Sequence, residues 1–256
     1  MKLQIIVEHQ EEQGQIMSNI DFSKLPSKAP EYDLRDLLEA GCHFGHQRNK
    51  WNPKMDRFIH ADKNGVHIFD LAKTAQQLQM AYNYFYLLGK QGKKVIMLGT
   101  KRHAREVIEE TAKDSGMMYI VSRWLGGFVT NWDQINKSIK QMRTMEKKFD
   151  SGEYDNFTKF EQAQLKKELT RLQRFFEGIS EIQSPPDVLF VVDAVKERIA
   201  VKEAQSADIP VVAILDSNGD PEMVQLPIPA NDDSVDSISF IVRELGTAYK
   251  LGREEK

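Results

Sequence analysis

The sequence predicts an α/β fold, a Rossmann-like (flavodoxin-like) parallel sheet with helices on both faces, interrupted by an inserted antiparallel coiled-coil helical hairpin. Three observations lead to this prediction. Apolar runs of strand length recur along the chain, longer segments with helical periodicity separate them, and one long interval has helical periodicity but no strand. Alternation of strands and helices is the pattern of a doubly wound sheet.

Five short apolar runs are predicted to form buried parallel strands. Each run is continuously apolar, as expected where helices cover both faces of a sheet. The runs are VHIF at 66–69, KVIMLG at 94–99, MYIVS at 118–122, DVLFVVD at 187–193 and PVVAILD at 210–216.

Four segments beside these strands are predicted to be helices. Their ends carry the residues that start or stop a helix: Gly92 follows the first, Gly116 follows the second, and NDDS at 231–234 offers capping side chains for the last. The segments span about 73–90, 102–115, 196–207 and 232–251.

Residues 131–180 are predicted to form the hairpin, because their apolar residues recur at gaps of three and four on either side of the turn DSGEYDNF at 150–157. One helix is marked by Trp132, Ile135, Ile139, Met142, Met145 and Phe149, the other by Leu165, Leu169, Leu172, Phe176 and Ile179. The chain then divides into an N-terminal extension at 1–30, expected to be flexible, an α/β domain at 31–130 and 181–251, the hairpin, and a tail at 252–256.

The charge distribution favours a polyanionic partner. The whole chain has a formal net charge of -3, which excludes a tail-driven, histone-like binder. Residues 41–150, however, contain 19 Lys and Arg against 10 Asp and Glu, a net charge of +9. A basic middle between acidic flanks suits one positive face for RNA.

The compartment follows from cysteine usage and hydropathy. Cys42 is the single cysteine, which excludes an intramolecular disulfide and is typical of a reducing compartment. No apolar run approaches the roughly 18 residues of a membrane helix, and acidic residues in MKLQIIVEHQEEQ argue against a signal peptide. We therefore expect a cytoplasmic protein with no membrane partner.

No catalytic residues can be recognised in the sequence. The turn GTKRHA lacks a dinucleotide-binding or P-loop motif, and Cys42 has no placed partner that would activate it. Lys101, Arg102 and Arg105 nevertheless place three cations at a predicted helix start, which suits a phosphate group such as an RNA backbone. A merely solvated helix face is the alternative.

Metal binding has weak support. His43 and His46 form an H-x-x-H pair, but no second histidine or cysteine pair stands at a zinc-site spacing. GCHFGH is more economically interpreted as an architectural turn, in which Gly41 and Gly45 take backbone angles that other residues cannot.

Asp193 and Asp216 end neighbouring strands and could together hold a structural divalent ion, although strand-end aspartates more often cap the next helix. No cofactor is expected otherwise.

Two loops carry the RNA hypothesis. QRNKWNPKMDRF at 47–58 interleaves cations with aromatic residues, so that phosphates and exposed bases could both be bound. RWLGGFVTN at 123–131 follows a predicted strand, and its two glycines permit close backbone approach. Core packing of the tryptophans is the alternative. The candidate RNA-binding residues are Arg48, Lys50, Trp51, Lys54, Arg57, Lys101, Arg102, Arg105, Arg123, Trp124, Gly126, Gly127 and Asn131.

Eight ordered motifs resemble the bacterial ribosomal protein S2 family of the small subunit, from about Leu37 to Leu251. They are AGCHFGHQRNKWNPKM, HIFDLAKT, GTKRHA, RWLGGFVTNW, DVLFVVD, IAVKEA, IPVVAILDSNGDP and PIPANDD. Cys42, Gly219 and Ala230 depart from the residues usual in the family, and the extension before residue 31 is longer than usual. The resemblance therefore implies no role for this extension.

The resemblance implies a Rossmann-like sheet with a coiled-coil hairpin, seated on small-subunit ribosomal RNA, without catalysis. It also implies protein partners in the small subunit, including the large multi-domain ribosomal protein one, with the hairpin as the natural docking element. Two other hypotheses stay open from the residues: a small-molecule enzyme that uses Asp193 and Asp216, and a protein-docking module whose RNA contact is minor.

Overall fold

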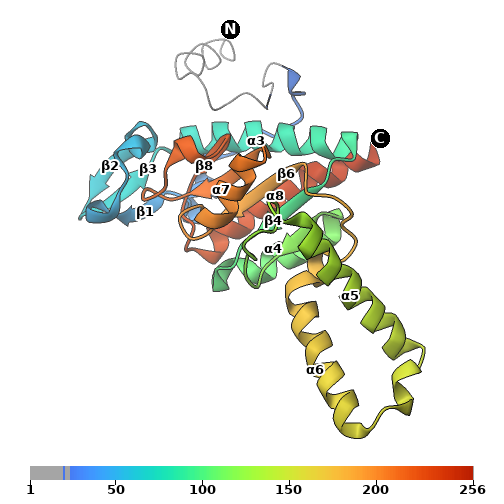
Figure 1. The fold of residues 1–256 in the computed structure, drawn as a ribbon. Coiled ribbons are helices and arrows are strands. Elements are labelled where there is room, and N and C mark those ends of the chain that lie inside the picture. The colour runs from blue at the N-terminus through green and yellow to red at the C-terminus, as the bar shows by residue number, and fades with distance from the viewer. Residues whose placement is uncertain (1–19, 21–23, 256) are drawn as a thin grey trace.

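The chain forms a five-stranded parallel sheet in the order β5-β4-β6-β7-β8 (Figure 1). The computed structural model describes Ile20 and residues 24–255. The strands are β4 (Val95–Leu98), β5 (Met118–Ile120), β6 (Val188–Val192), β7 (Val211–Leu215) and β8 (Leu226–Pro229). This is the 2-1-3-4-5 order of flavodoxin-like folds, so the predicted fold class is confirmed.

Helices cover both faces of this sheet. On one face, α3 (Leu71–Gln91), α4 (Arg102–Ser115) and α8 (Val235–Glu254) pack on alternate strand residues such as Val95 and Met97. On the other face, α7 (Arg198–Ser206) and the base of the hairpin pack on Ile96 and Leu98. All residues of β4, β6, β7 and β8 are buried, which explains their continuously apolar sequences.

A small antiparallel sheet adjoins the parallel one. Its order is β1-β3-β2, with β1 (Phe44–Gln47), β2 (Ile59–Lys63) and β3 (Val66–Phe69). The run VHIF was predicted to be a parallel strand of the main sheet, and this prediction is wrong: VHIF is β3. A four-residue run does not encode the direction of its neighbour, but the alternating burial of β3 is typical of an antiparallel strand.

Three strands, β1, β2 and β8, were not predicted from the sequence. β8 reads LPIP, and proline is normally evidence against a strand because it cannot donate a ladder hydrogen bond. β8 tolerates Pro227 and Pro229 because it is an edge strand that pairs only with β7. β1 and β2 were missed because their polar, largely exposed residues carry no apolar run.

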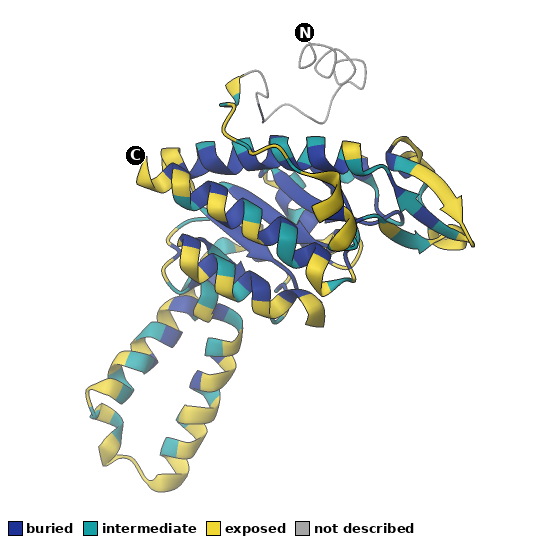
Figure 2. Cartoon of the chain, turned by 180° about the vertical axis from the view of Figure 1, so that it is seen from behind, coloured by how far each residue is buried: buried dark blue, intermediate teal, exposed yellow. Residues whose placement is uncertain are grey.

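The hairpin projects from the sheet domain as two helices, α5 (Trp132–Asp150) and α6 (Lys159–Phe176), linked by η4 (Glu153–Asn156) (Figure 1). A reciprocal capping box between Thr158 and Glu161 starts α6. Figure 2 shows that most residues of the distal part are exposed, while buried residues are more frequent nearer the sheet domain. Supercoiling of the two helices as a coiled coil stays a prediction.

The described part of the N-terminal segment packs on α3 ahead of α2 (Leu34–Glu39). The backbone N–H groups of Lys28 and Ala29 donate to Asn83 Oδ1 at 2.8 and 2.7 Å, and Gln79 Nε2 donates to the carbonyl of Pro30 at 3.1 Å. Residues 24–30, predicted to be flexible, therefore have defined contacts. The remainder of the predicted extension lies outside the described residues, except Ile20. None of the described helices is long and apolar enough to cross a membrane.

Candidate nucleic-acid interface

An ion cluster, buried except for Asp233, lies at the edge of the sheet where its parallel strands end. Lys101 follows β4, and its Nζ lies 2.8 Å from Asp193, 2.6 Å from Asp232 and 2.7 Å from Asp233. The Lys101 side chain is only 12% exposed. Lys101 was predicted to meet an RNA phosphate, but here it is a buried counter-ion for the protein's own carboxylates.

Opposing effects act on the ionisation of this cluster. Burial by itself would lower the pKa of Lys101, but the surrounding carboxylates outweigh burial and raise it. For Asp232, burial and the charge of Asp193 outweigh the attraction of Lys101 and raise the pKa of the carboxyl to about 7. Lys101 thus stays charged at neutral pH and stabilises carboxylates whose ionisation is otherwise unfavourable.

His46 connects the small sheet to the same edge. Its Nδ1 lies 2.8 Å from Asp216 Oδ2, and its backbone N–H donates to Asp216 Oδ1 at 2.8 Å. The hydrogen bond to Asp216 raises the pKa of the His46 imidazole, although burial opposes this. Gly45 allows the close approach, because a Cβ there would lie 3.1 Å from Ser217 Oγ.

Glycine geometry in this turn differs in part from the prediction. Gly41 has a φ of +73°, as predicted for a position that other residues rarely adopt. Gly45 was predicted to need unusual backbone angles as well, and this is wrong, because its φ is not positive. Space for the neighbouring chain, rather than the backbone angle, requires glycine there.

The predicted metal ligands Asp193 and Asp216 are largely engaged by protein groups. Asp193 accepts hydrogen bonds from Lys101 Nζ and from the backbone N–H of Lys196 in the turn at 194–197. It does not cap α7, the role considered as the alternative, because Glu197 is the N-cap residue of that helix. Among the described residues, His46, Asp216 and Asp232 instead offer ligand atoms within 4.8 Å of one another. The structural divalent ion considered for Asp193 and Asp216 stays a hypothesis, and no metal site is predicted.

The first predicted RNA loop lies on the outside of the ion cluster. It contains η2 (Arg48–Lys50) and η3 (Pro53–Phe58), which are fastened by the buried Met55 and Phe58. Arg48 and Lys50 are exposed, and Arg57 lies 4.8 Å from the Phe58 ring. Lys54 pairs with Asp220 at 3.1 Å and with Glu222, so two carboxylates already neutralise this predicted RNA contact.

The second predicted RNA loop is closed onto α7. The carboxylate of Glu203 accepts hydrogen bonds from the Trp124 indole at 3.3 Å and from the backbone N–H groups of Gly127 at 2.7 Å and Val129 at 3.2 Å. Trp124 is 6% exposed and packs on Phe128. Its ring therefore does not face solvent for base stacking, in agreement with the core-packing alternative.

The remaining candidates of this loop have different positions. Gly127 needs glycine, because its φ is +86°. Gly126 is exposed and borders open space, where an added Cβ would touch nothing within 4 Å. Arg123 and Asn131 are exposed, and Asn131 is the N-cap residue of α5. The exposed residues of this loop are thus Arg123, Gly126, Thr130 and Asn131.

The start of α4 presents Arg102 and Arg105 on the surface. The Arg105 Nε donates to the carbonyl of Thr100 at 3.0 Å, which orients its guanidinium. The two RNA loops and this helix start share one edge of the molecule: β4 and β5 end there side by side, and Asn52 N–H donates to the Ser217 carbonyl beyond β7 at 2.8 Å.

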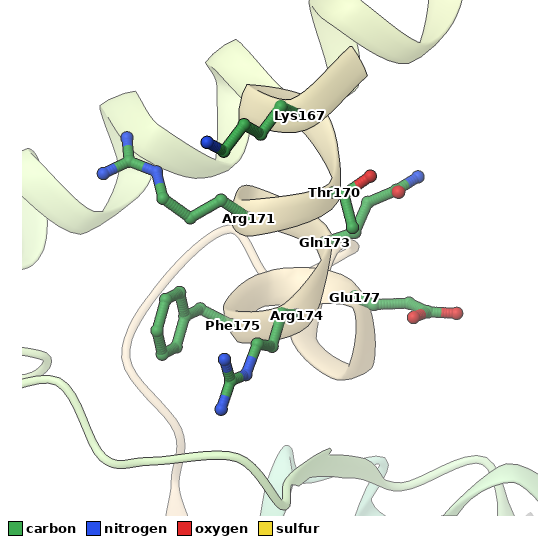
Figure 3. Close-up of a pocket in the computed structure, with 7 residues that line it drawn as sticks. All are labelled: Lys167, Thr170, Arg171, Gln173, Arg174, Phe175 and Glu177. Carbon is green, nitrogen blue, oxygen red and sulfur yellow. The ribbon is translucent and has the colours of Figure 1, made fainter. Parts of the chain in front are cut away.

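A further basic surface lies on α6 near the base of the hairpin, and the sequence analysis did not select it. Figure 3 shows Lys167, Arg171 and Phe175 projecting from the same side of the helix, with Arg174 beside them. The spacing of four residues between the first three could have indicated this surface. Glu203, Asp232 and Asp233 were not predicted as site residues either, although Glu203 lies in the motif IAVKEA and the two aspartates lie in PIPANDD.

We expect Lys101→Met to lower the free energy of unfolding by about 3–5 kcal/mol, because it leaves buried carboxylates without a counter-charge. Urea denaturation of the purified chain measures the loss. Lys113→Met is the matched control, since Lys113 forms an exposed pair with Glu109. Equal effects of the two substitutions would contradict a stabilising role for the buried cluster.

The ion pair of His46 should make stability depend on pH. Because the folded-state pKa of His46 is raised, its contribution is complete below the ordinary histidine pKa of about 6.5 and is lost as the pH rises through the folded value. The stability difference between wild type and His46→Asn should therefore be larger at about pH 6 than at about pH 9. Denaturation at both values tests this, with the exposed His60→Asn as control. A difference that is constant with pH, or equal to that of the control, contradicts it.

Removing the Glu203 carboxylate should open the loop at 124–129. We expect Glu203→Ala to lower the free energy of unfolding by roughly 1.5–3 kcal/mol, because three donors lose a charged acceptor. The amides of Gly127 and Val129 should exchange hydrogen faster, as measured by mass spectrometry. Glu203→Gln keeps one accepting oxygen and should have a smaller effect. Unchanged exchange in the alanine variant would exclude the anchoring role.

Comparison with known proteins agrees with this architecture. A family model described as ribosomal protein S2 matches residues 37–252. The small ribosomal subunit protein uS2 of Coprothermobacter proteolyticus is 45% identical over 221 residues, which are 86% of this chain and 82% of the relative. The uS2 proteins of Nostoc punctiforme and Oenococcus oeni are each 43% identical over 88% and 86% of this chain, and each match covers 85% of the relative. The chain therefore belongs to the ribosomal protein S2 family.

Proposed function

We propose that this chain is a structural component of the small ribosomal subunit that acts in translation and binds folded ribosomal RNA through the carboxyl edge of its parallel sheet. Family membership carries the proposal, since the relatives are small-subunit proteins by name. It assigns the chain a structural rather than a catalytic role. The proposed place of action is the ribosome, in the cytoplasm.

The exposed cations at this edge support the RNA contact. Arg102 and Arg123 are exposed, and neither forms an ion pair among the described residues. Lys50 is likewise exposed and unpaired within the described part of the chain. An RNA phosphate can therefore reach these groups without displacing a carboxylate, and phosphate contacts provide much of the affinity of proteins for nucleic acids.

The buried ion cluster favours the structural role over the enzymatic hypothesis. A doubly wound sheet binds small molecules where the strand order reverses, which here is between β4 and β6. Lys101 and Asp193 follow these two strands and pair with each other. In an enzyme with this fold, the side chains at these two positions would be directed at a ligand. Here Lys101 and Asp193 bind each other and stabilise the fold.

The hairpin is the proposed docking element for neighbouring small-subunit proteins, including the large multi-domain ribosomal protein one. Its distal turn exposes two aromatic side chains, Phe157 at 44% and Phe160 at 72%. Exposed aromatic residues on a projecting arm are suited to burial against a protein partner. This observation also favours the alternative of a protein-docking module with a minor RNA contact.

Salt dependence of RNA binding separates the two functions. We expect Arg102→Gln and Arg123→Gln each to weaken binding to a small-subunit ribosomal RNA transcript and to reduce the slope of log affinity against log salt by about one. Lys54→Gln is the matched control with a smaller effect, because Asp220 and Glu222 already neutralise Lys54. Filter binding over a range of salt concentrations measures all three. If no variant changes affinity or slope, the RNA contact lies elsewhere.

A further inference from the structure

An open pocket lies between the first predicted RNA loop and the turn that joins β2 to β3. Its lining includes three carboxamides, one guanidinium and one indole, contributed by Gln47, Asn49, Asn64, Arg48 and Trp51; the backbone at Gly65 and Val66 completes it. Among the described residues, no carboxylate lines the pocket. This combination of side chains suits a planar polar ligand, since each of them can either hydrogen-bond to such a group or stack on it.

Backbone contacts hold the walls of the pocket in place. The N–H of Arg48 donates to the carbonyl of Gly65 at 2.9 Å, which joins the two sides. Asn64 and Gly65 have φ values of 56° and 77°, the left-handed conformation of a tight hairpin turn. The pocket is therefore formed by the local fold and does not depend on a ligand to assemble it.

Trp51 is held at one side of the pocket by a buried aromatic contact. Its ring lies 4.9 Å from that of His67 and nearly perpendicular to it, at 88°. His67 is 4% exposed, whereas Trp51 remains partly exposed. The next residue, Asn52, is anchored to the Ser217 carbonyl. Unlike Trp124, Trp51 thus combines a fixed backbone with an accessible ring.

We propose that this pocket binds an unpaired nucleotide of the ribosomal RNA, with the base stacked on Trp51 and its edge hydrogen-bonded by the carboxamides. The inference rests on the proposed RNA-binding function and assigns one nucleotide site within it. Carboxamides offer a donor and an acceptor together, which matches the edge of a base. Arg48 then contacts the phosphate of the same nucleotide, because guanidinium groups bind phosphate oxygens in pairs.

The structure favours an unpaired nucleotide over duplex RNA. In an A-form helix the bases are stacked inside and their edges are poorly accessible to side chains, whereas a base in a loop or bulge can enter a pocket. Arg48 is available for this role, because its side chain is 75% exposed and its one ion pair within the described part of the chain, with Asp62, is long at 3.8 Å. An exposed pair of this kind is easily exchanged for a phosphate.

The test is binding and chemical footprinting of the full chain on a small-subunit ribosomal RNA transcript. We expect Trp51→Ala to weaken binding by roughly 5- to 150-fold, the range for losing one base stacked on an aromatic ring. Trp51→Phe should restore most of this loss. One unpaired nucleotide protected by the wild type should become reactive with Trp51→Ala, while the other protected positions stay protected.

A second pair of variants keeps the test independent of folding. Arg48→Gln removes an exposed cation directly after β1, and Lys63→Gln removes one at the end of β2, but of the two only Arg48 lines the pocket. The proposal is supported if Arg48→Gln exposes the same unpaired nucleotide as Trp51→Ala, whereas Lys63→Gln leaves that nucleotide protected. If Trp51→Ala and Arg48→Gln bind like the wild type, or if protection changes only in duplex regions, the nucleotide site is overturned. Failure of the wild type itself to bind the transcript would instead overturn the proposed function.

Discussion

The ammonium group of Lys101 is the contact on which the carboxyl edge of the sheet depends. It pairs with Asp193 beyond β6 and with Asp232 and Asp233 in the segment between β8 and α8, so it joins three parts of the chain that are distant in sequence. Buried carboxylates are stable only when they are paired or protonated. One cation therefore allows the strand ends and the last helix to meet, and β1 attaches to this edge through His46 and Asp216.

This arrangement divides the cations of the basic middle segment into two groups. Lys101 and Lys54 neutralise the protein's own carboxylates, and Glu203 closes the loop that contains Trp124. Arg102 and Arg123 remain exposed around the fixed framework. A rigid framework lowers the entropy lost when these side chains bind a polyanion. Some cations of the basic middle segment thus neutralise internal carboxylates, and others are available for the proposed RNA contact.

The parallel sheet could be predicted because strands that are buried on both faces, such as β4, β6 and β7, have continuously apolar sequences. In addition, Gly92 and Gly116 mark the ends of the helices α3 and α4. β8 could not, since its prolines are acceptable only at a sheet edge, and edge position is a tertiary property. β3 was recognised as a strand but assigned to the wrong sheet, because a short apolar run does not specify which strand pairs with it.

For the candidate site, the order of amino acids shows that cations, aromatic residues and glycines gather in two loops and at one helix start, and that these segments follow a family-specific order. The role of each side chain, in contrast, depends on the folded chain around it. Trp51 and Trp124 are the same residue type and both lie in predicted RNA loops, yet Trp51 borders an open pocket whereas Trp124 is buried against Phe128. Lys101 and Arg102 are neighbours, yet one is enclosed by three carboxylates and the other is exposed. The reason is physical: burial and charge pairing depend on residues far away in the chain, which local sequence does not specify.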